Sequence, residues 1–218
     1  MSLPACVPSM SMGVPAKPVR KKTKAVKRWR AGVLPETLKV MSMTKVPVSV
    51  RDEAETLFHI GFGVTKSSDI QENLCLQDKP MTTRSGRMPQ RRCSKNEAGT
   101  WLVWYTQAST MVGAAIVECV RGFAPSLKYI TAKPKTGAGH QLVRAAENLV
   151  CNKLRRNTLF SAADLNQQGQ AWGGQAKKSA VDAHRSWGFV EIQLDEWKKH
   201  CEHYYRGGGV AYMMKTLQ

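Results

Sequence analysis

Two glycines just ahead of an amphipathic segment are the first feature of this sequence with a chemical use. Gly137 and Gly139 lie in the run Lys-Pro-Lys-Thr-Gly-Ala-Gly-His at 133–140, and apolar residues recur at helical spacing directly after it. Glycine lets a backbone approach a ligand closely, and the unpaired N–H groups of a helix's first turn attract anions. The run therefore fits a diphosphate-binding turn, although a simple tight turn would explain it as well.

Two ionisable residues fall on otherwise apolar faces. Alternation places Glu118 among apolar residues of the strand expected at 111–120, and helical spacing places His184 in one row with Ala180, facing the core. A carboxylate can act as a base, and histidine exchanges a proton near neutral pH. Each has a structural alternative: Glu118 could turn to solvent at the strand end, and His184 could be a buried histidine bonded to a backbone carbonyl.

Periodicity also predicts the elements that would position these residues. Helical spacing covers 50–62, opened by Ser49 as a cap, and also 67–76, 139–154 and 175–187. Runs rich in β-branched and aromatic residues predict strands over 100–107, 111–120, 127–132, 157–163, 190–194 and 210–217. The chain is long enough for one such α/β (α+β) domain, expected at 36–218, and too short for two of ordinary size.

Charge is the strongest signal of the composition, with 33 Lys and Arg against 16 Asp and Glu, a net charge of +17. Residues 1–35 contain no acidic residue, and eight basic ones lie from Lys17 to Arg30, which predicts a disordered basic tail. A second basic loop is expected from Lys79 to Lys95. Both segments could bind nucleic-acid phosphates, while the tail could instead be a nuclear or organelle address or a solubilising extension.

Cysteine spacing and hydropathy bear on whether the protein has disulfides, a membrane span or a metal site. Six cysteines without a CxxC pair predict free thiols in a reducing, intracellular compartment. No apolar run approaches the roughly 18 residues that cross a bilayer, so we expect no membrane span. His200, Cys201 and His203 do not form a complete set of metal ligands, and we interpret them as surface residues of a polar stretch.

Three local patterns, in this order of elements, resemble the GCN5-related N-acetyltransferases over 39–217. The run at 133–142 is similar to the family's pyrophosphate loop, the run at 180–189 is similar to its motif ending in Gly-Phe, and the strand at 210–217 has a similar closing sequence. The resemblance implies a central mixed, mostly antiparallel sheet flanked by helices. It also implies transfer of an acetyl or similar acyl group from coenzyme A, as acetyl-CoA or another acyl-CoA, to an amine.

The resemblance further implies roles for named residues. His184 matches the tyrosine that protonates the leaving thiolate in the family, and Glu118 is then the best base. Tyr129 and Asp164 are further candidates, because they lie beside the strands that the family opens around the acyl group. The coenzyme A diphosphate would contact Ala132, Lys133, Lys135, Thr136, Gly137, Ala138, Gly139 and His140. A backbone N–H near Ala132 would stabilise the developing oxyanion.

Three functions remain open at this stage. The first is an N-acyltransferase acting on a small molecule or a protein. The second is an enzyme of the same fold acting on nucleic acid, which the positive charge favours. A partial similarity of 161–176 to the phage Mom family, which modifies adenine in DNA, also supports this second function. The third is a basic adaptor without catalysis, consistent with Pro134 in the loop and with His184 in place of tyrosine.

Overall fold

The computed structural model describes residues 38–63, 70, 71, 74, 99–165, 172, 178–201 and 209–218. The basic tail, the basic loop from Lys79 to Lys95, and His203 lie outside the described residues. Parts of the helices expected at 67–76 and 175–187 also lie outside them. All described residues belong to one compact unit, Ala31–Gln218.

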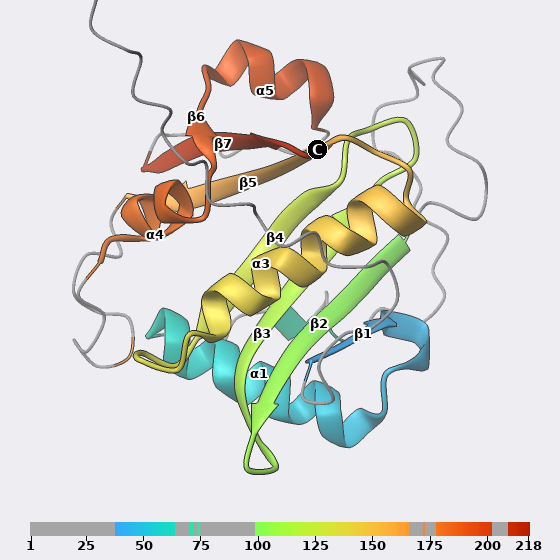
Figure 1. Ribbon diagram of the computed structural model, residues 1–218, viewed down its shortest axis with the longest axis vertical. Helices are drawn as coiled ribbons and strands as arrows, with labels where there is room; N and C mark the ends of the chain where they lie inside the picture. The colour runs from blue at the N-terminus through green and yellow to red at the C-terminus, as the bar shows by residue number, and fades with distance from the viewer. Residues whose placement is uncertain are drawn as a thin grey trace, which may run out of the picture. The chain divides into compact units, whose positions relative to one another are not determined.

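A seven-stranded sheet forms the centre of the described part, in the order β1-β2-β3-β4-β5-β7-β6 (Figure 1). Its strands are β1 (Leu38–Ser42), β2 (Gly99–Gln107), β3 (Thr110–Cys119), β4 (Ser126–Ala132), β5 (Thr158–Asp164), β6 (Val190–Glu191) and β7 (Val210–Thr216). All neighbouring strands are antiparallel except β4 and β5, which are parallel. The predicted mixed, mostly antiparallel sheet is confirmed.

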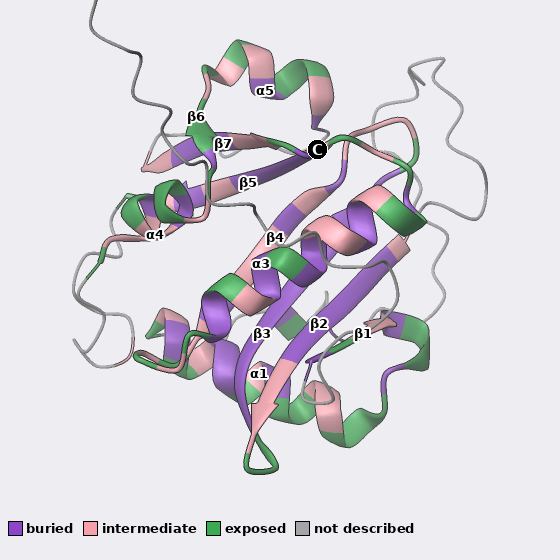
Figure 2. Ribbon diagram, in the orientation of Figure 1, coloured by how far each residue is buried: buried purple, intermediate pink, exposed green. Residues whose placement is uncertain are grey.

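Two helices cover opposite faces of this sheet, α1 (Val48–Phe62) and α3 (Ala138–Asn148). Strand alternation supplies each with an apolar surface: Val103 and Ala115 belong to the core beneath α3, while Leu102 and Ile116 belong to the core beneath α1. Figure 2 shows α3 with buried residues toward the strands and exposed residues on its outer side. We call these two sides the α3 face and the α1 face.

The shorter helices lie at the C-terminal end of the sequence. They are α4 (Ala180–Ser186) and α5 (Leu194–His200). Earlier in the sequence, the described residues also form the 3-10 turn η1 (Met43–Lys45) and the π-helical turn η2 (Leu149–Lys153). The residues of α4 and its following turn, including Val181 and Phe189, pack into the core of the α3 face. Trp197 of α5 packs against Phe160 and Tyr212, with ring centroids 5.8 and 4.9 Å apart.

Several element boundaries differ from the sequence prediction. Helix α1 begins at Val48, because the Pro47 carbonyl accepts its first amide hydrogen bonds, so Ser49 is not the cap. The helix predicted to reach residue 154 ends at Asn148 and continues as η2. The strand predicted at 190–194 is limited to Val190–Glu191, since helix α5 begins at Leu194.

The prediction of a polar surface stretch around residue 200 is wrong for Cys201. Its side chain is buried with Trp197 against the sheet, and burial raises the pKa of its thiol to about 12. Cys119, Cys151 and Cys201 are free thiols, as expected for the part of the chain described. No helix within the described ranges is long and apolar enough to cross a membrane.

Candidate functional site

Strands β4 and β5 begin side by side and then diverge (Figure 1). Only Ser126 with Phe160 and Leu127 with Ser161 form pairs, although each strand has seven residues. Beyond this point β5 stays paired with β7 along its whole length. The ladder between the two parallel strands therefore ends at Leu127, and we call the region beyond it the β4–β5 divergence.

The unpaired edge of β4 carries backbone groups directed into this divergence. The Lys133 N–H donates to the carbonyl of Val112, its direct partner on β3, over 2.7 Å. In an antiparallel pair, alternate residues direct their N–H and C=O groups toward the partner strand and away from it. Ile130 and Ala132 therefore direct theirs away from β3 and toward β5. Ala132 is the position near which the sequence analysis expected a backbone oxyanion donor.

A bulge in β4 decides which face its side chains occupy. The register between β3 and β4 shifts at Lys128, which is the extra residue on β4. Leu127 consequently belongs to the α3 face, whereas Tyr129, two residues later, packs on the α1 face. The Tyr129 ring contacts Phe58 and Phe62, with both centroid distances at 6.0 Å. Tyr129 thus lies among aromatic rings beside the β4–β5 divergence.

Glu118 is buried on β3 and ion-paired. Its carboxylate accepts from the Lys128 ammonium over 3.4 Å, and the residue is only 5% exposed. The alternative in which Glu118 turns to solvent is therefore wrong. Glu118 lies two residues after Ile116 on β3, so both side chains are on the α1 face. It lies opposite Ser126, at the end where β4 and β5 are still paired. Its role as a base remains a prediction.

The turn between β4 and α3 is stabilised by internal hydrogen bonds and has free space beside one glycine. The Thr136 hydroxyl donates to the Lys133 carbonyl over 2.7 Å and accepts from the Ala138 N–H over 3.3 Å. Gly137 adopts φ +71°, and no atom lies within 4 Å of the position that a Cβ would occupy. Gly137 therefore provides a left-handed turn with free space beside it, as a ligand-binding turn requires.

Gly139 has a different structural reason. A Cβ at this position would lie 2.7 Å from Cζ2 of Trp187, so the second glycine admits an aromatic ring. The N–H groups of Gly139 and His140 have no acceptor within the described ranges, as expected for the first turn of a helix. His140, Lys133 and Lys135 are exposed around them. The turn therefore offers unpaired amides and two ammonium groups to an anion.

His184 points from α4 to the sheet and is hydrogen-bonded at both ring nitrogens. Nδ1 lies 2.7 Å from the carbonyl of Ala180, and Nε2 lies 2.9 Å from Oγ of Ser161 on β5. Ser161 Oγ also lies 3.1 Å from the carbonyl of Leu127. His184 is 5% exposed and Ser161 1%. The expectation that His184 faces the core is confirmed, and its carbonyl partner is the one that the structural alternative required.

The surroundings of His184 favour the neutral imidazole. Burial lowers its pKa, and the hydrogen bond to Ala180 opposes this only in part. The rings of Trp187 and Phe189 lie 5.1 and 5.4 Å from it. Because a carbonyl can only accept, the neutral ring carries its proton on Nδ1 and leaves Nε2 unprotonated toward Ser161.

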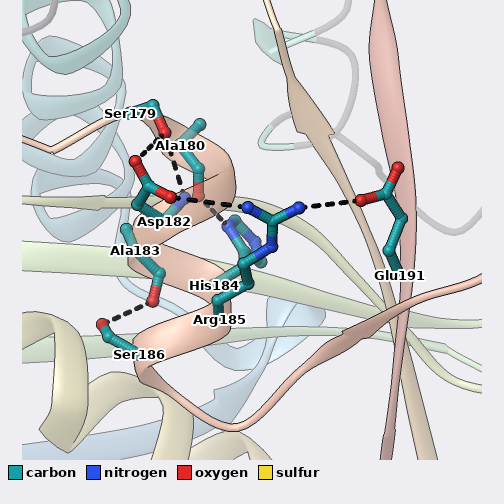
Figure 3. A network of polar contacts seen from close by, with 8 residues as sticks. All are labelled: Ser179, Ala180, Asp182, Ala183, His184, Arg185, Ser186 and Glu191. Carbon is teal, nitrogen blue, oxygen red and sulfur yellow. Dashed lines mark hydrogen bonds and ion pairs between the residues drawn. The ribbon is translucent and has the colours of Figure 1, made fainter.

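The exposed side of α4 holds the helix in place. Ser179 accepts from the Asp182 N–H over 3.0 Å as the helix cap. Figure 3 shows Arg185 between Asp182, at 3.6 Å, and Glu191 of β6, at 3.0 Å. These contacts fix α4 to the end of the sheet while His184 lies on its inner side.

The structure brings together some predicted residues and separates others. Ser161 and His184 meet where β4 and β5 begin to diverge, and Asp164 lies at the other end of β5, opposite Val210. Glu118 belongs to the α1 face, so it does not meet His184. Ser161 was not among the predicted site residues, although a hydroxyl on the same strand face as Leu159 and Ala163 is a detectable exception in an apolar pattern.

Comparison with solved structures identifies the fold. The chain is similar to Tetrahymena GCN5 at a TM-score of 0.54 and 10% identity, covering 83% of this chain and 96% of that one. An acetyltransferase from Streptococcus agalactiae gives 0.54 and 11%, covering 84% and 99%. The aminoglycoside 6'-N-acetyltransferase from Enterococcus faecium gives 0.51 and 11%, covering 82% and 96%. No protein-family model and no curated protein matches the sequence. The chain therefore has the fold of the GCN5-related N-acetyltransferases, as its sequence patterns suggested.

Proposed function

We propose that this protein is an N-acyltransferase that takes an acetyl or similar acyl group from coenzyme A and transfers it to an amine. The observation that carries the proposal is the β4–β5 divergence: the parallel ladder ends after two residue pairs, and the edge of β4 beyond it leads into the turn that is open at Gly137. The solved structures that share this fold and are titled acetyltransferases support it.

The residues present fit coenzyme A at both ends of its reactive arm. The Gly139 and His140 amides, with Lys133 and Lys135, suit its diphosphate. The backbone groups of Ala132 face the divergence, where they can pair with an extended amide-bearing chain or with a thioester oxygen. Bound there, acyl-CoA would supply a reactive thioester.

A direct test separates the diphosphate contacts from the rest of the site. Replacing both Lys133 and Lys135 by alanine is expected to weaken coenzyme A binding by roughly 5–20-fold, since an exposed charge contact is worth up to about 1 kcal/mol. Lys45→Ala is the matched control, because this exposed lysine follows the end of β1 that pairs with Trp101, far from the turn.

Calorimetry and thermal stabilisation with two probes complete this test. Coenzyme A should stabilise the protein, and pantetheine, which lacks the diphosphate, should bind wild type and the double variant equally. A protein that coenzyme A does not stabilise would contradict the acyltransferase proposal. A double variant that loses pantetheine as strongly as coenzyme A would refute the assignment of the diphosphate to this turn.

The acceptor class favoured by charge is nucleic acid. Residues 121–156 contain eight basic residues and one acidic residue, Glu147, which pairs with Lys215. Arg144, Lys153 and Arg155 are exposed along α3 and the turn after it. Arg144 lies within two turns of the start of α3, and Lys153 and Arg155 follow its C-terminal end, so a polyanionic acceptor is attracted along this side of the α3 face.

Salt dependence tests this second proposal. The triple replacement of Arg144, Lys153 and Arg155 by alanine should reduce the slope of log K against log salt by about 2–3 for duplex DNA, because each phosphate contact contributes about 0.9. Replacing Lys198 and Lys199 on α5, which pair with Asp195 and Glu196, is the control. An unchanged slope would refute this surface. DNA binding without any coenzyme A effect would instead support a basic adaptor.

A further inference from the structure

When His184 is neutral, the Ser161 hydroxyl has two hydrogen-bond acceptors beside it but only one proton to donate. Its hydroxyl lies within hydrogen-bond distance of two groups, Nε2 of His184 at 2.9 Å and the carbonyl of Leu127 at 3.1 Å. A hydroxyl has one proton to donate. When His184 is neutral with its proton on Nδ1, Nε2 and the Leu127 carbonyl both only accept, so Ser161 can serve just one of them.

Protonation of His184 completes the network. Nδ1–H then donates to Ala180, Nε2–H donates to Ser161, and Ser161 donates to Leu127. The Ser161 hydroxyl therefore changes direction with the charge of His184. Because Nδ1 is held by a carbonyl of its own helix, the path for a proton to or from Nε2 runs through Ser161.

The position of the hydroxyl links this network to the proposed reaction. Leu127 and Ser161 are the last pair of the parallel ladder, so Ser161 lies where the two strands begin to separate. The proposed function places the thioester in that divergence. Ser161 belongs to a strand that borders the divergence, whereas His184 lies on α4 and reaches that strand through its hydrogen bond to Ser161.

We infer that Ser161 and His184 form a proton shuttle that moves a proton from the attacking nitrogen to the leaving sulfur; this inference rests on the proposed function. Ser161 is the catalytic residue that contacts the reacting atoms, and His184 is a positioning residue that holds the proton between the two steps. The shuttle replaces a separate base and acid with one pair.

The proton transfers balance without a proton from solvent. As the new N–C bond forms, the nitrogen gives its proton to Ser161 Oγ, and the hydroxyl passes its own proton to Nε2 of neutral His184. As the C–S bond breaks, its electron pair remains on sulfur, Nε2 returns the proton to Oγ, and Ser161 gives its proton to the sulfur. Both residues end as they began.

The neighbours of the ring suit this cycle. The side chains that face it are Ser161, Trp187 and Phe189, and no carboxylate of the described residues does so. On α4 itself, Asp182 and Arg185 pair with each other on the exposed side. From β7, Lys215 lies over Phe189, 6.0 Å from its ring centroid, and pairs with Glu147 of α3. A neutral resting state and a short-lived cation are what such surroundings favour.

Nitrogen NMR of the histidine rings tests the contact without turnover. We expect a protonated Nδ1 and a bare Nε2 for His184 near pH 7.5. Coenzyme A should shift the Nε2 signal, desulfo-coenzyme A should shift it much less, and the difference should vanish in Ser161→Ala. Equal shifts from the two probes would overturn the proposed contact between Ser161 and the sulfur.

Thiol release from acetyl-CoA, with a polyamine, a lysine peptide and single-stranded DNA as acceptors, tests the shuttle itself. Ser161→Ala should lower kcat by about 100-fold, at the lower end of acid–base catalysis, with the coenzyme A Kd within about twofold. Ser161→Cys should recover part of the rate. Ser186→Ala is the control, because Ser186 lies on the same helix and donates only to the Ala183 carbonyl.

The outcomes distinguish this inference from the function on which it rests. An active wild type with an equally active, folded Ser161→Ala would overturn the shuttle alone. A wild type that neither binds coenzyme A nor releases thiol would overturn the acyltransferase proposal, and the shuttle with it. If Ser161→Ala does not fold, two other measurements decide. A Ser161→Cys variant as active as wild type, or equal Nε2 shifts from coenzyme A and desulfo-coenzyme A in wild type, would overturn the shuttle.

Discussion

Gly139→Ala tests whether the second glycine of the turn serves a ring or a ligand. The new Cβ would lie 2.7 Å from Cζ2 of Trp187 and 3.4 Å from Cε2, against a normal carbon–carbon contact of about 3.5–4.0 Å. Overpacking of this kind costs about 1–3 kcal/mol, whereas alanine in a helix gains at most about 1 kcal/mol over glycine. We therefore expect a net loss near 1 kcal/mol, or roughly 2–4 °C in Tm.

Trp187→Phe supplies the background that isolates the clash. Phenylalanine lacks the ring atoms that the new Cβ would meet, so Gly139→Ala should be neutral or stabilising there, with a coupling energy of about 1–3 kcal/mol between the two sites. Gly137→Ala is the matched control. Its cost comes from a φ of +71° with nothing within 4 Å, so it should be the same in both backgrounds.

Chemical denaturation of these variants gives the four free energies of the cycle, and coenzyme A titration gives the corresponding affinities. An equal cost of Gly139→Ala with Trp or Phe at 187 would refute the reasoning from the ring. A loss of coenzyme A affinity that persists in the Phe background would then assign the glycine to the ligand, as the sequence pattern alone suggested.

Two further predictions concern buried ionisable groups. Lys128→Ala should destabilise the fold by roughly 1–3 kcal/mol, since Glu118, 5% exposed, would lose its cation; adding Glu118→Gln should recover part of this, and an unchanged denaturation midpoint for the single variant would contradict it. Burial lowers the His184 pKa in the folded state, so the unfolded chain binds more protons below about pH 6.5, and the free energy of unfolding should fall as the pH drops through that value. His184→Asn should show a shallower fall; the same slope would be evidence against a buried neutral ring.

The regular elements were predictable where one local pattern decided them. Strands β2 and β3 and helix α3 carry clean periodicity, and their existence and order agree with the prediction. Helix α5 was missed because Trp197 is the only buried residue within it. The rings that cover Trp197, those of Phe160 and Tyr212, come from strands on either side of it in sequence. Local periodicity contains no information about such partners.

The faces of β4 were not predictable for a related reason. Simple alternation would place Leu127 and Tyr129 on the same side of the sheet. The extra residue, Lys128, turns them to opposite sides, and its ammonium pairs with the carboxylate of Glu118 on the neighbouring strand. A bulge depends on the partner strand's register, which the sequence of one strand does not specify.

Of the Ser161–His184 pair, only the histidine was predictable from the sequence. The row of α4 correctly placed His184 toward the core, but its partner Ser161 lies 23 residues away on a strand. Trp187 lies between this pair and the proposed diphosphate turn. Its ring approaches Gly139 at the turn and also packs against the His184 ring, with the centroids 5.1 Å apart. A ring that contacts both places couples them through packing, because a close-packed ring cannot shift toward one neighbour without changing its contact with the other. Trp187→Phe is therefore expected to alter both the coenzyme A affinity and the Nε2 signal of His184, whereas Lys45→Ala should alter neither; an effect on one alone would show that the turn and the Ser161–His184 pair are positioned independently.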